Sequence, residues 1–212
     1  FCSKRQQTMK IHKLYLQNIN SLEGEHVIDF DVPPLENTGI FAIIGPTGSG
    51  KSTLLDAITL ALYGRIPRSA RKTINKTAID EEGFILTDRA EECYTAVDYE
   101  VEGKQYRSKW SISRNRKGEL KEHHMELAAL PDGRLMVDKK SQVPDKNEEL
   151  SGLNYDQFIK SILLAQGDFT RFLRAKPAER GEILESITGT DIYRKIGQKA
   201  YEKQKEEKEK LR

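Results

Sequence analysis

Residues 45–53 read Gly-Pro-Thr-Gly-Ser-Gly-Lys-Ser-Thr, which fits the phosphate-binding pattern G-x-x-x-x-G-K-[ST]. The run before it, residues 39–44 (GIFAII), is short and apolar and predicts a buried strand. The run after it, residues 51–63, places apolar residues at helical spacing. A phosphate-binding loop needs a strand before it and a helix after it. The stretch therefore predicts an α/β domain that binds a nucleoside triphosphate.

Each residue type in this P-loop has a chemical reason. Glycines at positions 45, 48 and 50 let the backbone curl around a phosphate, where a Cβ would block the turn or the close approach. The helix that follows adds the partial positive charge of its N-terminus. Lys51 is expected to reach the β- and γ-phosphates, and the Ser52 hydroxyl is expected to coordinate Mg²⁺. The residues predicted to hold ATP are Gly45, Pro46, Thr47, Gly48, Ser49, Gly50, Lys51, Ser52 and Thr53.

The composition limits what accompanies this site. The chain has 212 residues and a net charge of +2, so any contact with nucleic acid has to come from local basic patches. Its two cysteines, Cys2 and Cys93, lack metal-ligand spacing and favour a reducing, cytoplasmic compartment. No apolar stretch approaches the roughly 20 residues of a membrane helix, so no membrane partner is expected. Residues 1–8 differ in character from the rest, and we expect them to be non-native residues ahead of a start at Met9.

The remaining sequence predicts a mainly antiparallel β section followed by helices. Turn signals at Glu23-Gly24, Glu102-Gly103 and Pro131-Asp132-Gly133 separate runs that alternate or are rich in β-formers. Residues 64–79 predict a basic loop, and the residues from Tyr155 onward predict helices. The predicted strands are 10–19, 27–30, 92–101, 105–112, 125–130 and 135–137.

Only half of an ATPase site is recognisable in the sequence. A Walker B strand ends in an acidic pair that holds Mg²⁺ and activates water. The nearest runs, residues 95–98 and 161–165, do not end in those acids. Residues 149–152 (ELSG) resemble the start of an ABC signature motif, but Leu153-Asn154 breaks it, and a turn is predicted there.

A second informative stretch is residues 161–173 (SILLAQGDFTRFL), in which Gln166 follows an apolar run and precedes a glycine. This is the form of a Q-loop, whose amide reaches Mg²⁺ or orients the attacking water, although ordinary helices also end in this way. Residues 9–30, the P-loop with its helix, and residues 163–192 (LLAQGDFTRFLRAKPAERGEILESITGTDI) together resemble the N-terminal ATPase segment of the SbcC family. That family comprises the bacterial SMC-like double-strand-break repair ATPases, and the resemblance covers nearly all of residues 9–200.

The resemblance implies the N-terminal lobe of an ABC-type P-loop ATPase head over residues 9–190. This lobe has an antiparallel β subdomain, a P-loop core and a helical Q-loop region. Residues 191–212 would be the root of a coiled coil, although their charge alone fits a solvated terminal helix equally well. The resemblance also implies catalytic roles for Lys51 and Gln166, and Mg²⁺ contacts for Ser52 and Gln166. Asn20 and Ser21 fall where the first strand of the family ends in a loop that touches the nucleotide.

The resemblance implies several partners. The head of this family is split, so a C-terminal lobe supplies the signature motif and Walker B, and ATP bridges two heads of a homodimer. An SbcD-type nuclease subunit docks at the base of the coiled coil, near residues 185–212, and double-stranded DNA binds the engaged heads. The basic stretches 64–76 and 104–117 are either DNA contacts or ordinary solvated surface. The expected location is cytoplasmic and associated with the nucleoid.

Three other functions share parts of this pattern. The nucleotide-binding domain of an ABC transporter has a P-loop and a Q-loop, but usually closer together than Lys51 and Gln166. A P-loop small-molecule kinase needs its own acidic base and an arginine-rich lid, for which the loop 64–76 could be mistaken. A non-hydrolysing clamp would use ATP binding alone to organise an assembly.

Overall fold

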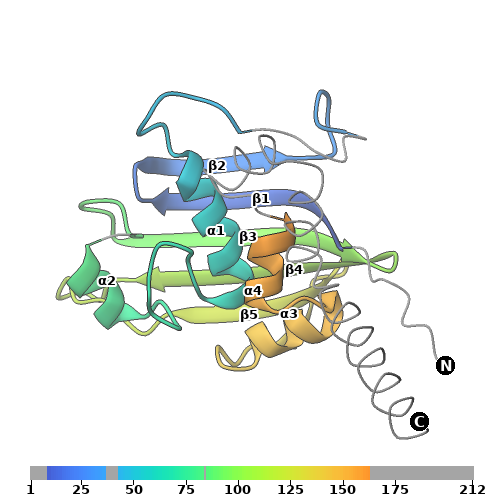
Figure 1. Ribbon diagram of the computed structural model, residues 1–212. Helices are drawn as coiled ribbons and strands as arrows, with labels where there is room; N and C mark the ends of the chain where they lie inside the picture. Colours follow the sequence, from blue (N-terminus) through green and yellow to red (C-terminus); the bar gives the residue numbers. More distant parts are fainter. Residues whose placement is uncertain (1–8, 37–42, 84, 163–212) are drawn as a thin grey trace, which may run out of the picture. The chain divides into compact units, whose positions relative to one another are not determined.

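Six strands form one antiparallel sheet in the order β2-β1-β3-β4-β5-β6 (Figure 1). The computed structural model describes residues 9–36, 43–83 and 85–162 of the chain. The central strands β3 and β4 pair without a register shift, while β1 pairs with β3 across a bulge. The strands are β1 (Met9–Ile19), β2 (Leu22–Asp29), β3 (Glu92–Val101), β4 (Lys104–Ser113), β5 (His124–Leu130) and β6 (Arg134–Val137).

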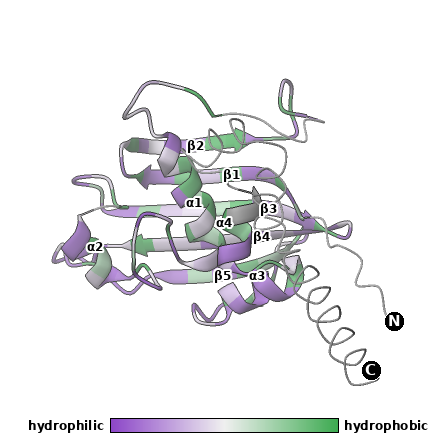
Figure 2. Cartoon of the chain, in the orientation of Figure 1, coloured by the Kyte–Doolittle hydropathy of each residue, from purple (hydrophilic) through white to green (hydrophobic). Residues whose placement is uncertain are grey.

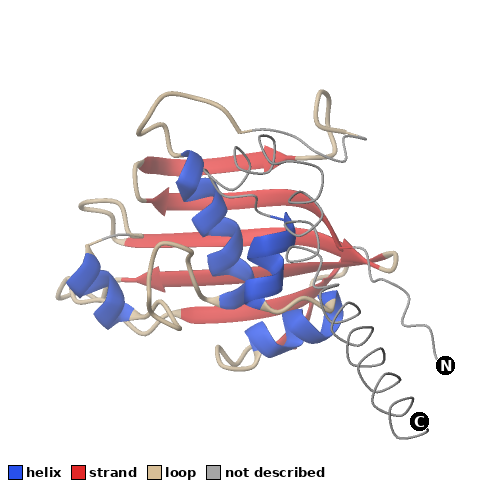
Figure 3. Cartoon of the chain, in the orientation of Figure 1, coloured by secondary structure: helices blue, strands red, loops and turns tan. Residues whose placement is uncertain are grey.

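Helix α1 (Lys51–Tyr63) lies across one face of this sheet (Figure 3). Thr95 Oγ1 of β3 donates a hydrogen bond to the Ala57 carbonyl at 3.0 Å. Ser108 Oγ of β4 donates to the Ala61 carbonyl at 2.7 Å. Figure 2 shows hydrophobic residues along α1 and the strands that it crosses, whereas α3 is mostly hydrophilic. The core therefore lies between α1 and the central strands.

Helix α3 (Val143–Ser151) is attached to this core through one buried asparagine. Asn147 is 1% exposed, and its Oδ1 accepts a hydrogen bond from the Tyr99 hydroxyl at 2.7 Å. Its Nδ2 donates to the Leu62 carbonyl at 2.7 Å and to Ser108 Oγ at 2.9 Å. A buried amide is costly unless its hydrogen bonds are made, so this network fixes α3 in one position.

The antiparallel section and the bounds of α1 agree with the sequence-based prediction, but the first turn does not. The chain reverses at Asn20-Ser21, not at Glu23-Gly24, and β2 already begins at Leu22. Asn18 and Asn20 adopt left-handed conformations (φ 51° and 53°), which asparagine tolerates better than most residues. The amide of Gly24 then donates to Asn18 Oδ1 at 2.8 Å inside the ladder.

Two segments predicted as loop or turn are helical. Helix α2 (Lys76–Glu82) occupies the end of the predicted 64–79 loop, because Asn75 Oδ1 accepts a hydrogen bond from the Ala78 amide and caps the helix. Residues 149–151 form the last turn of α3, which Gly152 ends in a left-handed conformation (φ 70°). In both segments the helix cap, Asn75 or Gly152, was a local signal in the sequence that the prediction did not use.

The strand predicted at 39–44 falls mostly outside the described residues. Its last two residues, Ile43 and Ile44, are described, irregular and exposed (39% and 87%), so the prediction is wrong for them. A strand is held by ladder hydrogen bonds to a neighbour, and none of the described strands pairs with these two residues.

The second part of the chain starts at Leu153 and is described as far as Ile162. It forms helix α4 (Tyr155–Ile162), as predicted. Asn154 Oδ1 accepts from the Gln157 amide at 2.9 Å, and Gln157 Oε1 accepts from the Asn154 amide at 3.0 Å, a reciprocal cap. Among the described helices, none combines the length and apolarity that crossing a bilayer requires. The predicted coiled-coil root at 191–212 lies outside the described residues.

Candidate nucleotide-binding site

The P-loop leads directly into the N-terminus of α1. The N-cap is Gly50 in a left-handed conformation (φ 84°), and among the described residues no side chain caps the helix. The first turn also contains no acidic residue. The first N–H groups of a helix have no intrahelical partner, and the helix dipole gives them a positive potential. This end of α1 is therefore open to an anion.

The Lys51 ammonium folds back over the loop. Its Nζ donates hydrogen bonds to the carbonyl oxygens of Gly45 at 2.8 Å and Pro46 at 2.6 Å. Residues 45–49 are exposed, and no carboxylate of the described residues forms an ion pair with Lys51. A phosphate oxygen is a stronger, charge-assisted acceptor than a neutral carbonyl. The ammonium can therefore exchange these carbonyls for a phosphate without leaving a buried acid unpaired.

Two glycines of the loop occupy places where a side chain would collide. A Cβ on Gly45 would lie 2.8 Å from Ser49 Oγ, within the loop itself. A Cβ on Gly50 would lie 3.0 Å from Leu22 Cδ2. Because Leu22 is the first residue of β2, this second contact places the β1–β2 turn against the start of α1.

Asn20 lies in that turn and has a donor without a partner. Its backbone N–H donates to the Ile85 carbonyl at 2.7 Å, and its Oδ1 accepts from the Ile85 amide at 2.8 Å. Its Nδ2 is shielded from solvent and has no hydrogen-bond partner among the described residues. An unsatisfied donor of this kind costs about 1–3 kcal/mol, which a ligand oxygen would recover. Ser21, the next residue of the turn, is exposed.

The other predicted site residues have different surroundings. Ser52 is exposed on the first turn of α1, as an Mg²⁺ contact requires, while Thr53 is 5% exposed and belongs to the buried side of the helix. Gln166 lies outside the described residues, so its place relative to the P-loop is not described. Sequence reasoning overlooked Asp56, which is 2% exposed and lies one helical turn after Ser52. A carboxylate within an apolar helix stripe was the available signal.

These residues fit a nucleoside triphosphate with Mg²⁺. Glycine at 45, 48 and 50 leaves the backbone of the loop without a Cβ at those positions, which is what a close approach of backbone N–H groups to a phosphate requires. Lys51 supplies an ammonium and Ser52 a hydroxyl at the same end of the helix. Hard oxygen ligands such as a hydroxyl and phosphate oxygens suit Mg²⁺, which keeps much of its water shell.

Several basic side chains of the two candidate DNA stretches already form ion pairs with carboxylates. Arg68 forms an ion pair with Asp56, and Arg71 forms ion pairs with Glu81 and Glu82. Hydrogen bonding to Glu82 raises the pKa of Arg71, as expected for a guanidinium next to carboxylates. Together with Lys76, which pairs with Glu122, these arginines are balanced by carboxylates, whereas Lys72 is exposed and forms no ion pair with the described residues.

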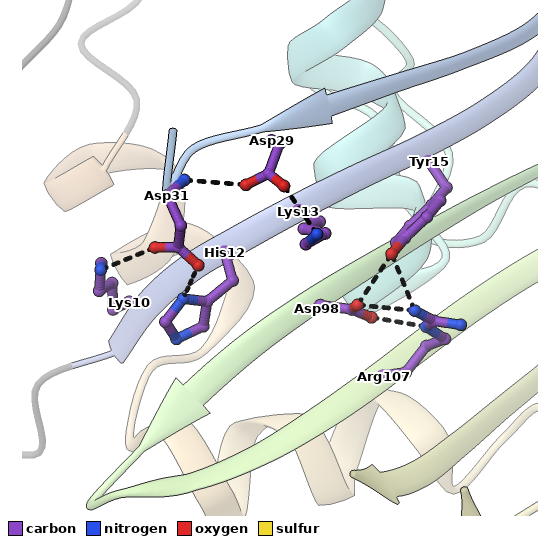
Figure 4. Close-up of polar contacts among 8 residues, drawn as sticks. All are labelled: Lys10, His12, Lys13, Tyr15, Asp29, Asp31, Asp98 and Arg107. Carbon is purple, nitrogen blue, oxygen red and sulfur yellow. Dashed lines mark hydrogen bonds and ion pairs between the residues drawn. The ribbon is translucent and has the colours of Figure 1, made fainter. Parts of the chain in front are cut away.

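Arg107 is held on the sheet face that α1 leaves uncovered (Figure 4). Its Nε and Nη2 donate to the two oxygens of Asp98 at 2.6 and 2.7 Å, and Nη2 also donates to the Tyr15 hydroxyl at 3.0 Å. The guanidinium lies 4.6 Å from the centre of the Tyr15 ring. These contacts join β1, β3 and β4, so Arg107 has a structural role.

Three basic side chains that form no ion pair with the described residues lie at the turn after β4. Arg114 donates from Nη1 to the Gly118 carbonyl at 2.7 Å, which is a neutral partner. Arg116 and Lys117 are exposed and form no ion pair with the described residues. Apart from the exposed Lys104, this turn is the part of the stretch 104–117 that still presents unbalanced positive charge.

Comparisons with known proteins identify the family of this chain. A family model described as an AAA domain matches residues 13–212. The SbcC subunit of the nuclease SbcCD from Pseudomonas aeruginosa is 38% identical over 208 residues, which are 92% of this chain and 17% of that protein. The protein of the same name from Bacillus subtilis is 37% identical over 190 residues, 87% of this chain and 16% of that protein. The DNA double-strand break repair Rad50 ATPase of Methanocaldococcus jannaschii is 30% identical over 173 residues, 82% of this chain and 15% of that protein.

The fold and the loop before α1 define a P-loop nucleotide-binding domain of α/β class. The chain belongs to the AAA domain family, as an N-terminal ATPase segment of the SbcC and Rad50 type. It spans less than a fifth of the length of these relatives.

Proposed function

We propose that this chain is the ATP-binding N-terminal lobe of a split, ABC-type ATPase head of the SMC-like family. The observation that carries the proposal is the open N-terminus of α1, with Lys51 folded over the loop and Gly50 as its cap. A loop that only shaped a turn would not need an ammonium lying over an uncapped helix end.

The residues of this lobe would grip the triphosphate while a second lobe supplies the acids. The backbone of residues 45–50 would surround the β-phosphate, Lys51 would bind the β- and γ-phosphates, and Ser52 would hold Mg²⁺. Gln166 would approach the same ion and the attacking water. Asn20 Nδ2, which has no partner among the described residues, would donate to the nucleotide. Mg²⁺ offsets the charge that develops on the phosphate oxygens during hydrolysis.

The proposed partners follow from the missing Walker B and signature motifs of this ATPase site and from the names of the relatives. A C-terminal lobe of the same ATPase would supply Walker B, and a second head would cover the γ-phosphate with its signature motif. ATP would favour the engaged pair because its γ-phosphate contacts both heads only in that state. The assembly would act with an SbcD-type nuclease subunit on double-stranded DNA. We propose a cytoplasmic location at the nucleoid.

The test of this proposal is ATP hydrolysis by the chain alone and after co-expression with the C-terminal segment of its gene. We expect no turnover alone, and turnover with the second segment that Lys51→Ala abolishes. Robust hydrolysis by the chain alone would overturn the split head. Phosphoryl transfer to a nucleoside or metabolite would favour a small-molecule kinase, and ATP binding without turnover in the complete head would favour a clamp.

DNA binding is tested at the turn after β4. We expect reversal of charge in Arg114→Glu/Arg116→Glu to weaken the binding of a DNA duplex by the co-expressed head and to flatten its dependence on salt. Arg71→Glu is the matched control, because the Arg71 guanidinium already has two carboxylate partners. Equal affinity of the double variant and the wild type across a salt series would remove this turn from the DNA interface.

A further inference from the structure

Asp56 and Arg68 connect the P-loop helix with the loop that follows it. Asp56 lies on α1, and its side chain is 3% exposed. Arg68 belongs to the loop after the helix, and its Nη2 forms an ion pair with Asp56 Oδ2. Tyr63, the last residue of α1, is seven positions after Asp56, which corresponds to about 10 Å along the helix axis. The Arg68 side chain therefore reaches back along α1, from the loop after the helix to the level of Asp56.

The loop is closed at its base and tethered in its middle. The Ile74 amide donates to the Gly64 carbonyl at 2.8 Å, and both Ile66 and Ile74 are fully buried. The residues between these two isoleucines form a surface loop, and the Arg68 ion pair connects this loop to α1. Figure 1 shows this loop beside α1, between that helix and α2. Without Asp56, the middle of the loop would lose this ion pair with the P-loop helix.

The position of Asp56 relates the tether to the nucleotide site. Asp56 follows Ser52 by four residues, so the two lie on the same side of α1 and about 6 Å apart along its axis. The Arg68 guanidinium thus contacts α1 about one helical turn below the predicted Mg²⁺ contact. A buried ion pair is a weak source of stability, because desolvation of both charges offsets their attraction. Burial also raises the pKa of Asp56 to about 6, against the effect of Arg68.

We propose that Asp56 is a positioning residue for nucleotide binding, which acts through Arg68 to hold the Gly64–Ile74 loop against the P-loop end of α1. The inference rests on the proposed function, since it assumes that the P-loop binds ATP. It adds a wall to the site, formed by a loop that the phosphate-binding motif does not include. Asp56 and Arg68 act on the position of this loop and not on the phosphates.

A purely electrostatic role predicts the opposite result for one variant. Asp56→Asn removes a negative charge one turn below the phosphates, so charge alone would tighten ATP binding. A positioning role requires Asp56→Asn to weaken binding, because the loop loses its tether. Arg68→Gln weakens binding in either case, but only a shared tether makes the double variant no worse than each single one.

The experiment measures the binding of Mg²⁺ with a fluorescent ATP analogue by the head co-expressed with its C-terminal segment. We expect Asp56→Asn and Arg68→Gln each to raise Kd about tenfold, and the double variant to match them. Arg68→Lys, which keeps the charge, should recover part of the loss. Arg71→Gln is the matched control, because it breaks the ion pairs of the same loop with α2 and leaves the tether to α1 intact. It should change Kd less than twofold.

Thermal unfolding of each variant distinguishes positioning from stability. Arg68 is partly exposed (43%), so Arg68→Gln tests the tether even where Asp56→Asn lowers the yield of folded protein. Lower melting temperatures with unchanged Kd for both variants would overturn the inference, as would tighter binding by Asp56→Asn. If wild type and Lys51→Ala bind the analogue equally, the P-loop assignment is wrong, and the proposed function fails together with this inference.

Discussion

The two ends of α1 are held in opposite ways. From Ala57 to Leu62 the helix is buried, and its carbonyls at 57, 61 and 62 accept additional hydrogen bonds from Thr95, Ser108 and Asn147. At its first turn the helix has a glycine cap and an exposed Ser52, and no side chain in the described part of the chain bonds its N–H groups. Buried hydrogen bonds fix the second half of the helix, whereas the first turn is exposed and its lysine bonds only neutral carbonyls of the loop.

This difference separates stability from function along one helix. Fixed packing at the buried half keeps the helix N-terminus in place, so that the groups of the anion site remain available to a ligand. Changes at the buried half should therefore alter unfolding, and changes at the open end should alter ligand binding. The following predictions test whether the separation holds.

The largest expected effect on stability is at Asn147. Asn147→Ala removes its three hydrogen bonds and leaves the Tyr99 hydroxyl and the Leu62 carbonyl without their buried partner. We expect a loss of about 3 kcal/mol in the free energy of unfolding, measured with urea. Asn115→Ala is the matched control, because the side chain of Asn115 bonds only within an exposed turn. A loss below about 1 kcal/mol at Asn147 would show that α3 is held by other contacts.

Two buried titratable groups should change the stability of the fold in opposite directions as the pH falls. Burial against Trp110 lowers the pKa of His123 to about 4, so the folded state resists its protonation. The stability that the neutral His123 imidazole contributes is present above its pKa in the unfolded chain, about 6.5, and is lost as the pH falls towards 4. Burial raises the pKa of Asp56 to about 6, so its contribution is present below the unfolded value and is lost as pH rises through 6.

The variants His123→Phe and Asp56→Asn separate the two contributions. Relative to wild type, His123→Phe should become more stable by about 2 kcal/mol on going from pH 7 to pH 4. Asp56→Asn should become less stable relative to wild type over the same range, by a similar or smaller amount, because Arg68 favours the carboxylate. Urea unfolding at several pH values measures both differences. Parallel curves for wild type and His123→Phe would show that His123 is protonated in the folded state as readily as in the unfolded chain.

Sequence reasoning identified the P-loop because its requirements are local. Glycine at 48 and 50, lysine at 51 and the helix after them are adjacent in the chain, so a short pattern records all of them. The antiparallel strands were equally accessible, since alternation and the Glu102-Gly103 turn are local signals too.

Contacts between distant segments were not accessible in this way. Nothing in the pattern indicates that Asn147 bonds Leu62, or that Arg68 returns to Asp56, because both contacts depend on how the helices and loops pack. The strand predicted at 39–44 illustrates the same limit. Apolar residues such as Ile43 and Ile44 indicate that a segment tends to be buried as a strand, but they do not identify the strand with which it would pair.

The smallest expected effect lies at the boundary between the two ends of α1. Gly48 and Gly50 have the same φ of 84°, but only a Cβ on Gly50 meets another side chain, Leu22 Cδ2 at 3.0 Å. Both glycine-to-alanine variants should lose about 1–2 kcal/mol through backbone strain. Gly50→Ala should lose a few tenths of a kcal/mol more in urea unfolding, and Leu22→Val should recover that difference because it shortens the opposing side chain. If Gly48→Ala and Gly50→Ala are equally stable, then the β1–β2 turn does not constrain the start of α1, and the open end is independent of the sheet.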